Sequence, residues 1–157
     1  MVVHSKWDSL KEVKSKKGKN ATATIFCASF WKDVKLTIAV FEPLFKVLHM
    51  VDGDVKPSVG FVYGELLKAK RQIKEALVNI ETCFKDIIEI VDKKMGGRLD
   101  SPLHLTAYLL NPHYSYVDPS IFDAPKMSVA FISCVETFYY HDEEMQTQAA
   151  NFELQKF

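Results

Sequence analysis

The chain has 157 residues, of which 48% are hydrophobic and 25% are charged, and its 20 basic and 20 acidic residues give a formal net charge of zero. This composition is typical of one globular domain, and it argues against disorder and against polyanion or membrane binding through overall charge. The N-terminus lacks the apolar core of a signal peptide, and no run of about 18 apolar residues predicts a membrane span.

The cysteines and the chain ends bear on the origin of the sequence. Cys27, Cys83 and Cys134 lie far apart. An odd number without a close pair is not typical of a disulfide framework, and it favours a reducing compartment, either the nucleus or the cytoplasm. The chain starts and ends inside helical patterns, "SKWDSL" and "ANFELQKF". We therefore expect a piece of a longer protein, or a product descended from one.

The N-terminal segment predicts a helix followed by a loop. Trp7, Leu10 and Val13 recur at helical spacing, which predicts a first helix over about residues 4–16. Gly18-Lys19-Asn20 is a loop signal. A break in helical structure is therefore expected close to residue 18.

A long helix follows this loop. Apolar residues recur in steps of three and four over residues 30–48, which predicts one buried helix face. Proline lacks an amide hydrogen and clashes with the carbonyl four residues back, so Pro43 predicts a kink near 39–43. The turn signal Asp52-Gly53-Asp54 is expected to end the helix. The predicted face consists of Phe30, Val34, Ile38, Phe41, Phe45 and Leu48.

The next helix contains two glycines four residues apart. Ser58 is its expected N-cap, because a serine hydroxyl accepts from the free amides of the first turn. Gly60 and Gly64 weaken a helix interior, and we interpret them as positions where another element packs closely rather than as a ligand site. The predicted apolar stripe consists of Val59, Val62, Leu66, Ala69, Ile73 and Leu77.

Two further helices are expected in the middle of the chain. A stripe of four apolar residues predicts a helix that ends at Gly96-Gly97. Ser101 as N-cap and Pro102 at the first helical position then open a short helix, which Asn111-Pro112 ends. This short helix is apolar nearly all round, which predicts a buried position. The stripe of the preceding helix consists of Phe84, Ile88, Val91 and Met95.

The C-terminal part predicts a connector and two helices. Residues 113–125 are rich in aromatic residues and predict an irregular connector. The run "SVAFISCV" is compatible with a strand, but the length of the apolar pattern favours a core helix. Asp142 is the expected N-cap of a last helix. The predicted core residues of the helix before it are Met127, Ala130, Phe131, Cys134, Val135 and Phe138.

These elements define an all-α fold class. No convincing pair of strands occurs, and the short loops favour antiparallel neighbours. We expect a single helical domain over residues 1–157, organised as a bundle of six or seven helices.

Enzyme motifs are absent from the sequence. It contains neither a glycine-rich phosphate loop nor a GxSxG motif, and its histidines and cysteines form no HxxxH or CxxC pair. Asp52 and Asp54 could hold a hard cation, but two carboxylates without the rest of a calcium loop favour a solvated turn. His104 could meet His113, and we interpret it as a structural histidine that donates to a backbone carbonyl. No catalytic residue, metal ligand or cofactor is therefore expected.

One cluster of charge is the candidate nucleic-acid-binding site. Five lysines and one acid occur within residues 11–19, a net of four positive charges. Such lysines are typical of contacts with nucleic-acid phosphates, and a solvated helix end is the alternative. Tyr114, Tyr116 and Phe122 could stack on bases, although aromatic packing beneath the connector is the commoner arrangement. The clustered lysines are Lys11, Lys14, Lys16, Lys17 and Lys19.

Several blocks of the sequence together carry a resemblance to a known family. Residues 29–77 contain "SFWKDVKLTIAVFEPLFKVLHMVDGDVKP" and "GFVYGELLKAK", and residues 87–112 read "IIEIVDKKMGGRLDSPLHLTAYLLNP". "SKW" lies at residues 5–7, and "FISCVETFYYHDEEMQTQAANFELQKF" forms the C-terminus. In order, spacing and style these blocks resemble the plant hAT-superfamily DNA transposases and their domesticated relatives. The sequence departs from the family at Met95-Gly96-Gly97, where a tryptophan-containing run is usual, and at Leu105-Thr106, where alanines are usual.

The resemblance implies a helical region without catalytic residues. The family has an RNase H-like domain split by a large helical insertion, and its metal-binding acids lie before and after the matched region. We therefore expect a non-catalytic helical domain that binds the DNA backbone through the lysines, or binds a protein partner or a second copy, and does not bind a membrane. A protein-interaction or scaffold module without DNA binding is the alternative, and a metal-dependent nuclease fragment is a more remote one.

Overall fold

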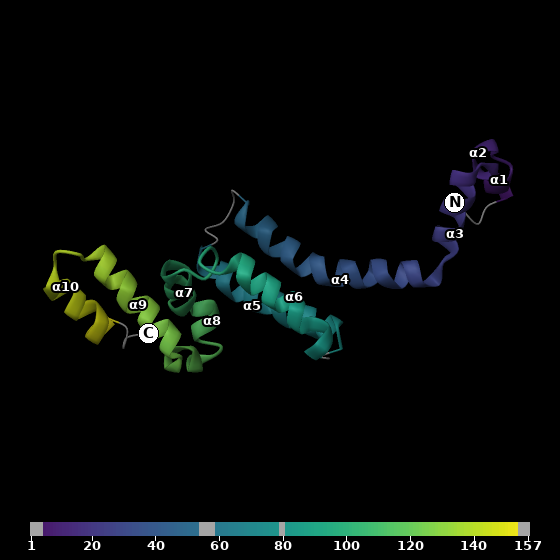
Figure 1. The fold of residues 1–157 in the computed structure, drawn as a ribbon. Helices are drawn as coiled ribbons and strands as arrows, with labels where there is room; N and C mark the ends of the chain where they lie inside the picture. Colours follow the sequence, from purple (N-terminus) through teal and green to yellow (C-terminus); the bar gives the residue numbers. More distant parts are fainter. Residues whose placement is uncertain (1–4, 54–58, 79–80, 154–157) are drawn as a thin grey trace. The chain divides into compact units, whose positions relative to one another are not determined.

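The computed structural model describes residues 5–53, 59–78 and 81–153, and in these ranges the chain is helical without a strand. The all-α fold class is therefore confirmed, although the helices are more numerous and shorter than the six or seven expected (Figure 1). The chain divides into two compact units, an N-terminal unit, Met1–Phe41, and a C-terminal unit, Glu42–Phe157. The expected single domain over residues 1–157 stays a prediction.

The N-terminal unit begins with three short helices, and the predicted helix over 4–16 is wrong. The chain forms α1 (Ser5–Asp8) and α2 (Lys11–Lys14), and the predicted loop at 18–20 lies inside α3 (Lys16–Phe26). Ser15 causes the break: its hydroxyl donates to the Glu12 carbonyl at 2.6 Å and accepts from the Gly18 amide at 3.1 Å. It thus ends one helix and caps the next.

Position 18 needs a glycine because the backbone of α2 packs closely against it, and not because the chain forms a loop there. A Cβ atom at Gly18 would lie 2.6 Å from the Cα of Val13, so a larger residue would collide with the backbone of α2. Two tryptophans fix the neighbouring helices: the Trp7 indole donates to the Thr22 hydroxyl at 3.2 Å, and the Trp31 indole donates to the Ile25 carbonyl at 2.6 Å. These bonds connect α1 to α3, and α3 to the start of the next helix.

Helix α4 (Ala28–Val51) ends before Asp52, as predicted, but it buries a different face from the predicted one. The helix continues through Pro43, and the kink near 39–43 stays a prediction. Its buried residues are Val40, Pro43 and Val47. Periodicity could not decide between two apolar faces of one helix, because only packing selects the face that is covered. The residues of the predicted face that are exposed are Phe30, Ile38, Phe41, Phe45 and Leu48.

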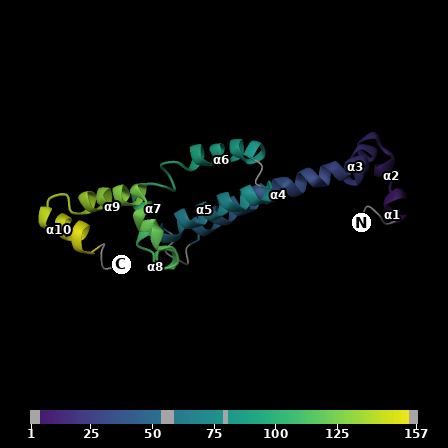
Figure 2. The same ribbon diagram turned by 90° about the horizontal axis from the view of Figure 1, so that it is seen from below.

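The C-terminal unit is built around one short helix that lies between two longer ones (Figures 1 and 2). Helix α7 (Pro102–Leu109) packs against α5 (Val59–Ala76) on one side and against α9 (Pro125–Phe138) on the other. Its residues Leu105, Thr106, Tyr108 and Leu109 are buried, and Leu109 is fully inaccessible. The elements are α5 (Val59–Ala76), α6 (Glu81–Met95), α7 (Pro102–Leu109), α8 (Pro112–Ser115), η1 (Pro119–Asp123), α9 (Pro125–Phe138), α10 (Glu143–Gln148) and η2 (Ala149–Glu153).

The apolar stripes predicted for α5 and α9 are largely confirmed, whereas on α6 only Val91 of the predicted stripe is buried. On α5 every stripe residue except Val59 is buried, and on α9 every predicted core residue except Phe138 is buried. Phe138 is 72% exposed because it lies in the last turn of α9, beyond the contacts of the core. Gly97 follows the end of α6 and, at a φ of 73°, has the left-handed conformation that glycine tolerates.

Two other expectations need correction. The connector at 113–125 is not irregular, since α8 and η1 fill most of it. Helix α7 is buried on one face rather than all round, because Leu103 is 48% exposed.

Asp142 caps α10 as predicted, and its carboxylate accepts from the Met145 amide at 2.9 Å. The predicted cap at Ser58 lies outside the described residues.

The two glycines of α5 permit close packing, as predicted. A Cβ atom at Gly64 would lie 2.6 Å from the Tyr114 hydroxyl oxygen, so the ring of Tyr114 occupies the space that a side chain would need. Gly60 faces Asn111, whose side-chain amide donates to the Gly60 carbonyl at 2.9 Å. The same Asn111 caps α8 by accepting from the His113 amide at 3.0 Å. Asn111 therefore caps α8 and connects it to α5.

We expect Gly64→Ala to destabilise the fold by about 1–3 kcal/mol, since the new methyl group would overlap the Tyr114 ring. Urea denaturation followed by circular dichroism measures the effect. In a Tyr114→Ala background the same substitution should instead stabilise, by up to about 1 kcal/mol, because alanine is the better helix former and the obstacle is gone. An equal effect in both backgrounds would contradict the close contact.

Candidate functional site

The five candidate lysines lie on two helices that pack together. Lys11 and Lys14 belong to α2, and Lys16, Lys17 and Lys19 begin α3. All five are exposed. Within the part of the chain that the structure describes, none of them forms an ion pair. The structure thus brings the lysines to the junction of two packed helices, where their charge faces solvent.

The net charge of zero is the sum of two opposite net charges, one on each unit. The N-terminal unit has eight lysines and three acidic residues, a net of five positive charges. The C-terminal unit has twelve basic and seventeen acidic residues, a net of five negative charges. The composition of the whole chain could not indicate these two net charges, because they cancel in the total. A local field at the lysines is therefore compatible with overall neutrality.

The start of α3 adds to the positive field at the lysines. The first turn of α3 carries no acidic residue. The N-terminal end of a helix has a partial positive charge because its first amides have no partner within the helix. Lys16, Lys17 and Lys19 surround this end, so side-chain charge and helix dipole have the same sign there.

A second feature, in the C-terminal unit, is a cleft of about 520 Å³ between α5 and the segment from α7 to η1. Its charged residues are two acids and two bases, so the cleft has no net charge that would select a ligand. Glu65 pairs with Lys68 at 3.3 Å, and Asp118 accepts from the Ser120 hydroxyl at 2.5 Å. The sequence prediction missed this cleft, although the charged residues on α5 that lie off its apolar stripe were visible.

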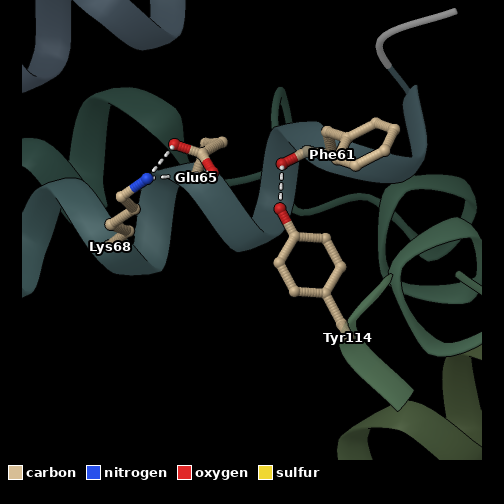
Figure 3. Close-up of polar contacts among 4 residues, drawn as sticks. All are labelled: Phe61, Glu65, Lys68 and Tyr114. Atoms are coloured by element: carbon tan, nitrogen blue, oxygen red, sulfur yellow. Dashed lines mark hydrogen bonds and ion pairs between the residues drawn. The ribbon is translucent and has the colours of Figure 1, made fainter. Parts of the chain in front are cut away.

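Tyr114 closes one side of the cleft. Figure 3 shows its hydroxyl pointing at the carbonyl of Phe61, at an O–O distance of 3.4 Å, with the Glu65–Lys68 pair on the same helix. Burial, and to a smaller extent the negative charge of Glu65, raises the pKa of Tyr114 to about 12. The Tyr114 hydroxyl therefore stays protonated at neutral pH, and the ring packs against the core and against Gly64.

Of the other two aromatic residues of the connector, one packs against the core and one is exposed. Phe122 packs against the core, as Tyr114 does, which confirms packing beneath the connector for these two. Tyr116 is 68% exposed.

His104 forms a hydrogen bond, but not to the expected partner. Its Nδ1 atom lies 2.7 Å from the hydroxyl oxygen of Ser101, not at a backbone carbonyl. The Ser101 hydroxyl, for its part, does not cap α7 through a backbone amide. The interpretation of His104 as a structural residue is therefore supported with a corrected partner. His113 is exposed, and its ring contacts Phe61 in a tilted arrangement and Tyr114 edge to face.

Other candidate ligands are dispersed. Among the described residues, no three histidine, cysteine, aspartate or glutamate side chains gather closely enough to hold a metal ion. Asp52 is exposed, and Asp54 lies outside those residues. Cys134 is buried and accepts from the Thr106 hydroxyl at 3.3 Å, whereas Cys27 is exposed. A hydrogen bond with the Ser29 hydroxyl lowers the pKa of the Cys27 thiol.

Comparisons with known proteins add no relative: no family model, no curated protein and no solved structure matches the chain. Among the helices of the described ranges, none is both long and apolar enough to cross a membrane.

We expect His104→Ala to lower the free energy of unfolding by about 1 kcal/mol, the usual contribution of one hydrogen bond, without unfolding the protein. Ser101→Ala should cost a similar amount. If the two side chains act as a pair, the double variant should cost little more than either single variant in urea denaturation. Additive effects would show that they act independently.

We also expect the fold to lose stability as the pH rises from about 10 to about 12. Over this window the tyrosine of the unfolded chain ionises, whereas Tyr114 in the folded chain holds its proton. Urea denaturation at a series of alkaline pH values measures the loss. Tyr114→Phe should reduce the slope, and an unchanged slope would show that the loss comes from other groups.

Proposed function

We propose that this chain is a non-catalytic helical domain that binds nucleic acid by contacting its phosphates through Lys11, Lys14, Lys16, Lys17 and Lys19. The observation that carries the proposal is the concentration of unpaired, exposed lysines on a unit with five net positive charges. Lysines that neutralise phosphates release condensed counterions, which stabilises a complex without reading the base sequence.

The resemblance to hAT-superfamily transposases supports the same proposal. We infer that the chain derives from the helical insertion of such an enzyme, whose metal-binding acids lie outside the matched region. A domain of this origin contributes to a DNA-binding protein without performing the strand-transfer chemistry itself. We therefore assign the chain to binding rather than to catalysis, and the expected compartment is the nucleus or the cytoplasm.

Reversing the charge of Lys14, Lys16 and Lys17 to glutamate should weaken binding to duplex DNA. Each lost phosphate contact removes about 0.9 from the slope of log K against log salt, so the triple variant should flatten that slope by about 2 to 3. Fluorescence anisotropy of a labelled duplex, titrated with the full chain at several salt concentrations, measures both quantities.

The matched control reverses three lysines of the C-terminal unit, Lys85, Lys93 and Lys94, which are exposed on α6. This variant has the same overall charge as the first, so it separates a local effect from a change in net charge. We expect it to keep the wild-type slope. Wild-type affinity and slope in the α2–α3 variant, or equal losses in both variants, would overturn the proposal.

A further inference from the structure

Three exposed aromatic side chains lie at the junction of α3 and α4, within the N-terminal unit. Phe26 is the last residue of α3 and is 60% exposed. Phe30 and Trp31 belong to the first turn of α4 and are 37% and 46% exposed. A single exposed aromatic residue is ordinary, but a group of three indicates a surface that binds a partner. We call these three residues the aromatic platform.

Two contacts hold the aromatic platform in place. The Trp31 indole donates to the Ile25 carbonyl at 2.6 Å, which attaches its ring to the C-terminal end of α3. The rings of Phe30 and Trp31 meet edge to face, with centroids 5.2 Å apart and an interplanar angle of 76°. Because the only polar atom of Trp31 has a partner, the side chain presents ring surface to solvent. Rings that are already fixed lose little conformational entropy when they bind a ligand.

Lysines border the aromatic platform on both helices. On α3, Lys19 and Phe26 are seven residues apart, so they lie on one face of the helix, about 10 Å apart along its axis. On α4, Lys35 lies one turn beyond Trp31 on the same face. Asp33 is two positions from each of these and therefore lies on the other side of α4. Both lysines are exposed, in a unit with five net positive charges.

Exposed rings among lysines are the features of a site for single-stranded nucleic acid. Aromatic side chains stack on unpaired bases of any sequence, while neighbouring cations follow the phosphates. A duplex also offers phosphates to the lysines, but the faces of its bases are covered by the neighbouring base pairs. Only a single strand can therefore contact the lysines and the aromatic platform at the same time.

The distance between the lysines and the aromatic platform suits a short stretch of one strand. Successive nucleotides of a stacked strand rise about 3.4 Å, so about three nucleotides span the two helical turns from Lys19 to Phe26. We propose that the N-terminal unit prefers single-stranded to duplex nucleic acid, because the aromatic platform stacks on unpaired bases while the lysines contact the phosphates. This preference rests on the proposed function, since it requires that the lysines bind phosphates.

The affinities of the full chain for two labelled ligands, compared at one salt concentration, test the preference. One ligand is an oligothymidylate of about 20 nucleotides, which is longer than the usual single-strand site of about 4–16 nucleotides. The other is the duplex that this strand forms with oligoadenylate. Fluorescence anisotropy should show that the wild type binds the single strand at least about tenfold more tightly than the duplex.

Removal of single rings tests the aromatic platform. Trp31→Ala and Phe26→Ala should each weaken binding of the single strand about 5- to 150-fold, which corresponds to about 1–3 kcal/mol for one stacked base. Neither variant should change duplex binding or the slope of log K against log salt, because no phosphate contact is lost. The matched control is Phe138→Ala, which removes a ring that is 72% exposed in the C-terminal unit and should change neither affinity.

Trp31→Phe separates stacking from a structural role of the indole. Phenylalanine keeps an aromatic ring but cannot donate to the Ile25 carbonyl. This variant should keep most of the preference for the single strand, and circular dichroism should confirm that all variants are helical. A loss as large as that of Trp31→Ala would assign the effect to the hydrogen bond and overturn stacking by Trp31.

The remaining outcomes separate the preference from the proposed function. Equal affinities for the two ligands, tighter binding of the duplex, or equal losses for both ligands in the platform variants would overturn the preference. The proposed function then stands if charge reversal of Lys14, Lys16 and Lys17 still weakens duplex binding. A wild type that binds neither ligand overturns the proposed function, and the preference with it.

Discussion

The burial of α7 between α5 and α9 is the constraint on which the C-terminal unit depends. Leu109 is inaccessible to solvent, and Thr106 donates to the sulfur of Cys134 across the contact with α9. On the other side, Asn111 holds the end of α7 against α5 through the Gly60 carbonyl. A polar bond therefore secures each contact of an otherwise apolar helix. Because each bond is buried or half-buried, loss of one partner would leave the other without a hydrogen bond, which favours one arrangement of the three helices.

Local signals in the sequence predicted this unit well because they depend on neighbouring residues. The stripe from Val62 to Leu77 and the cap at Asp142 are properties of one helix each. Gly64 could be predicted as a site of close approach, but its partner Tyr114 could not, because fifty residues separate them. The short helices α8 and η1 were missed because Asn111-Pro112 was interpreted only as the end of a helix and the residues after it as an irregular connector. Pro112 and Pro119 each stand at the start of a helical turn.

The N-terminal unit was harder to predict because competing signals have similar strength there. Gly18 looks like a loop residue in the sequence, yet it lies inside α3 because α2 packs directly against it. The positions of the five lysines were visible in the sequence, but their arrangement depends on the break at Ser15. The opposite net charges of the two units could not be predicted, because the boundary after Phe41 follows from packing and no residue pattern marks it.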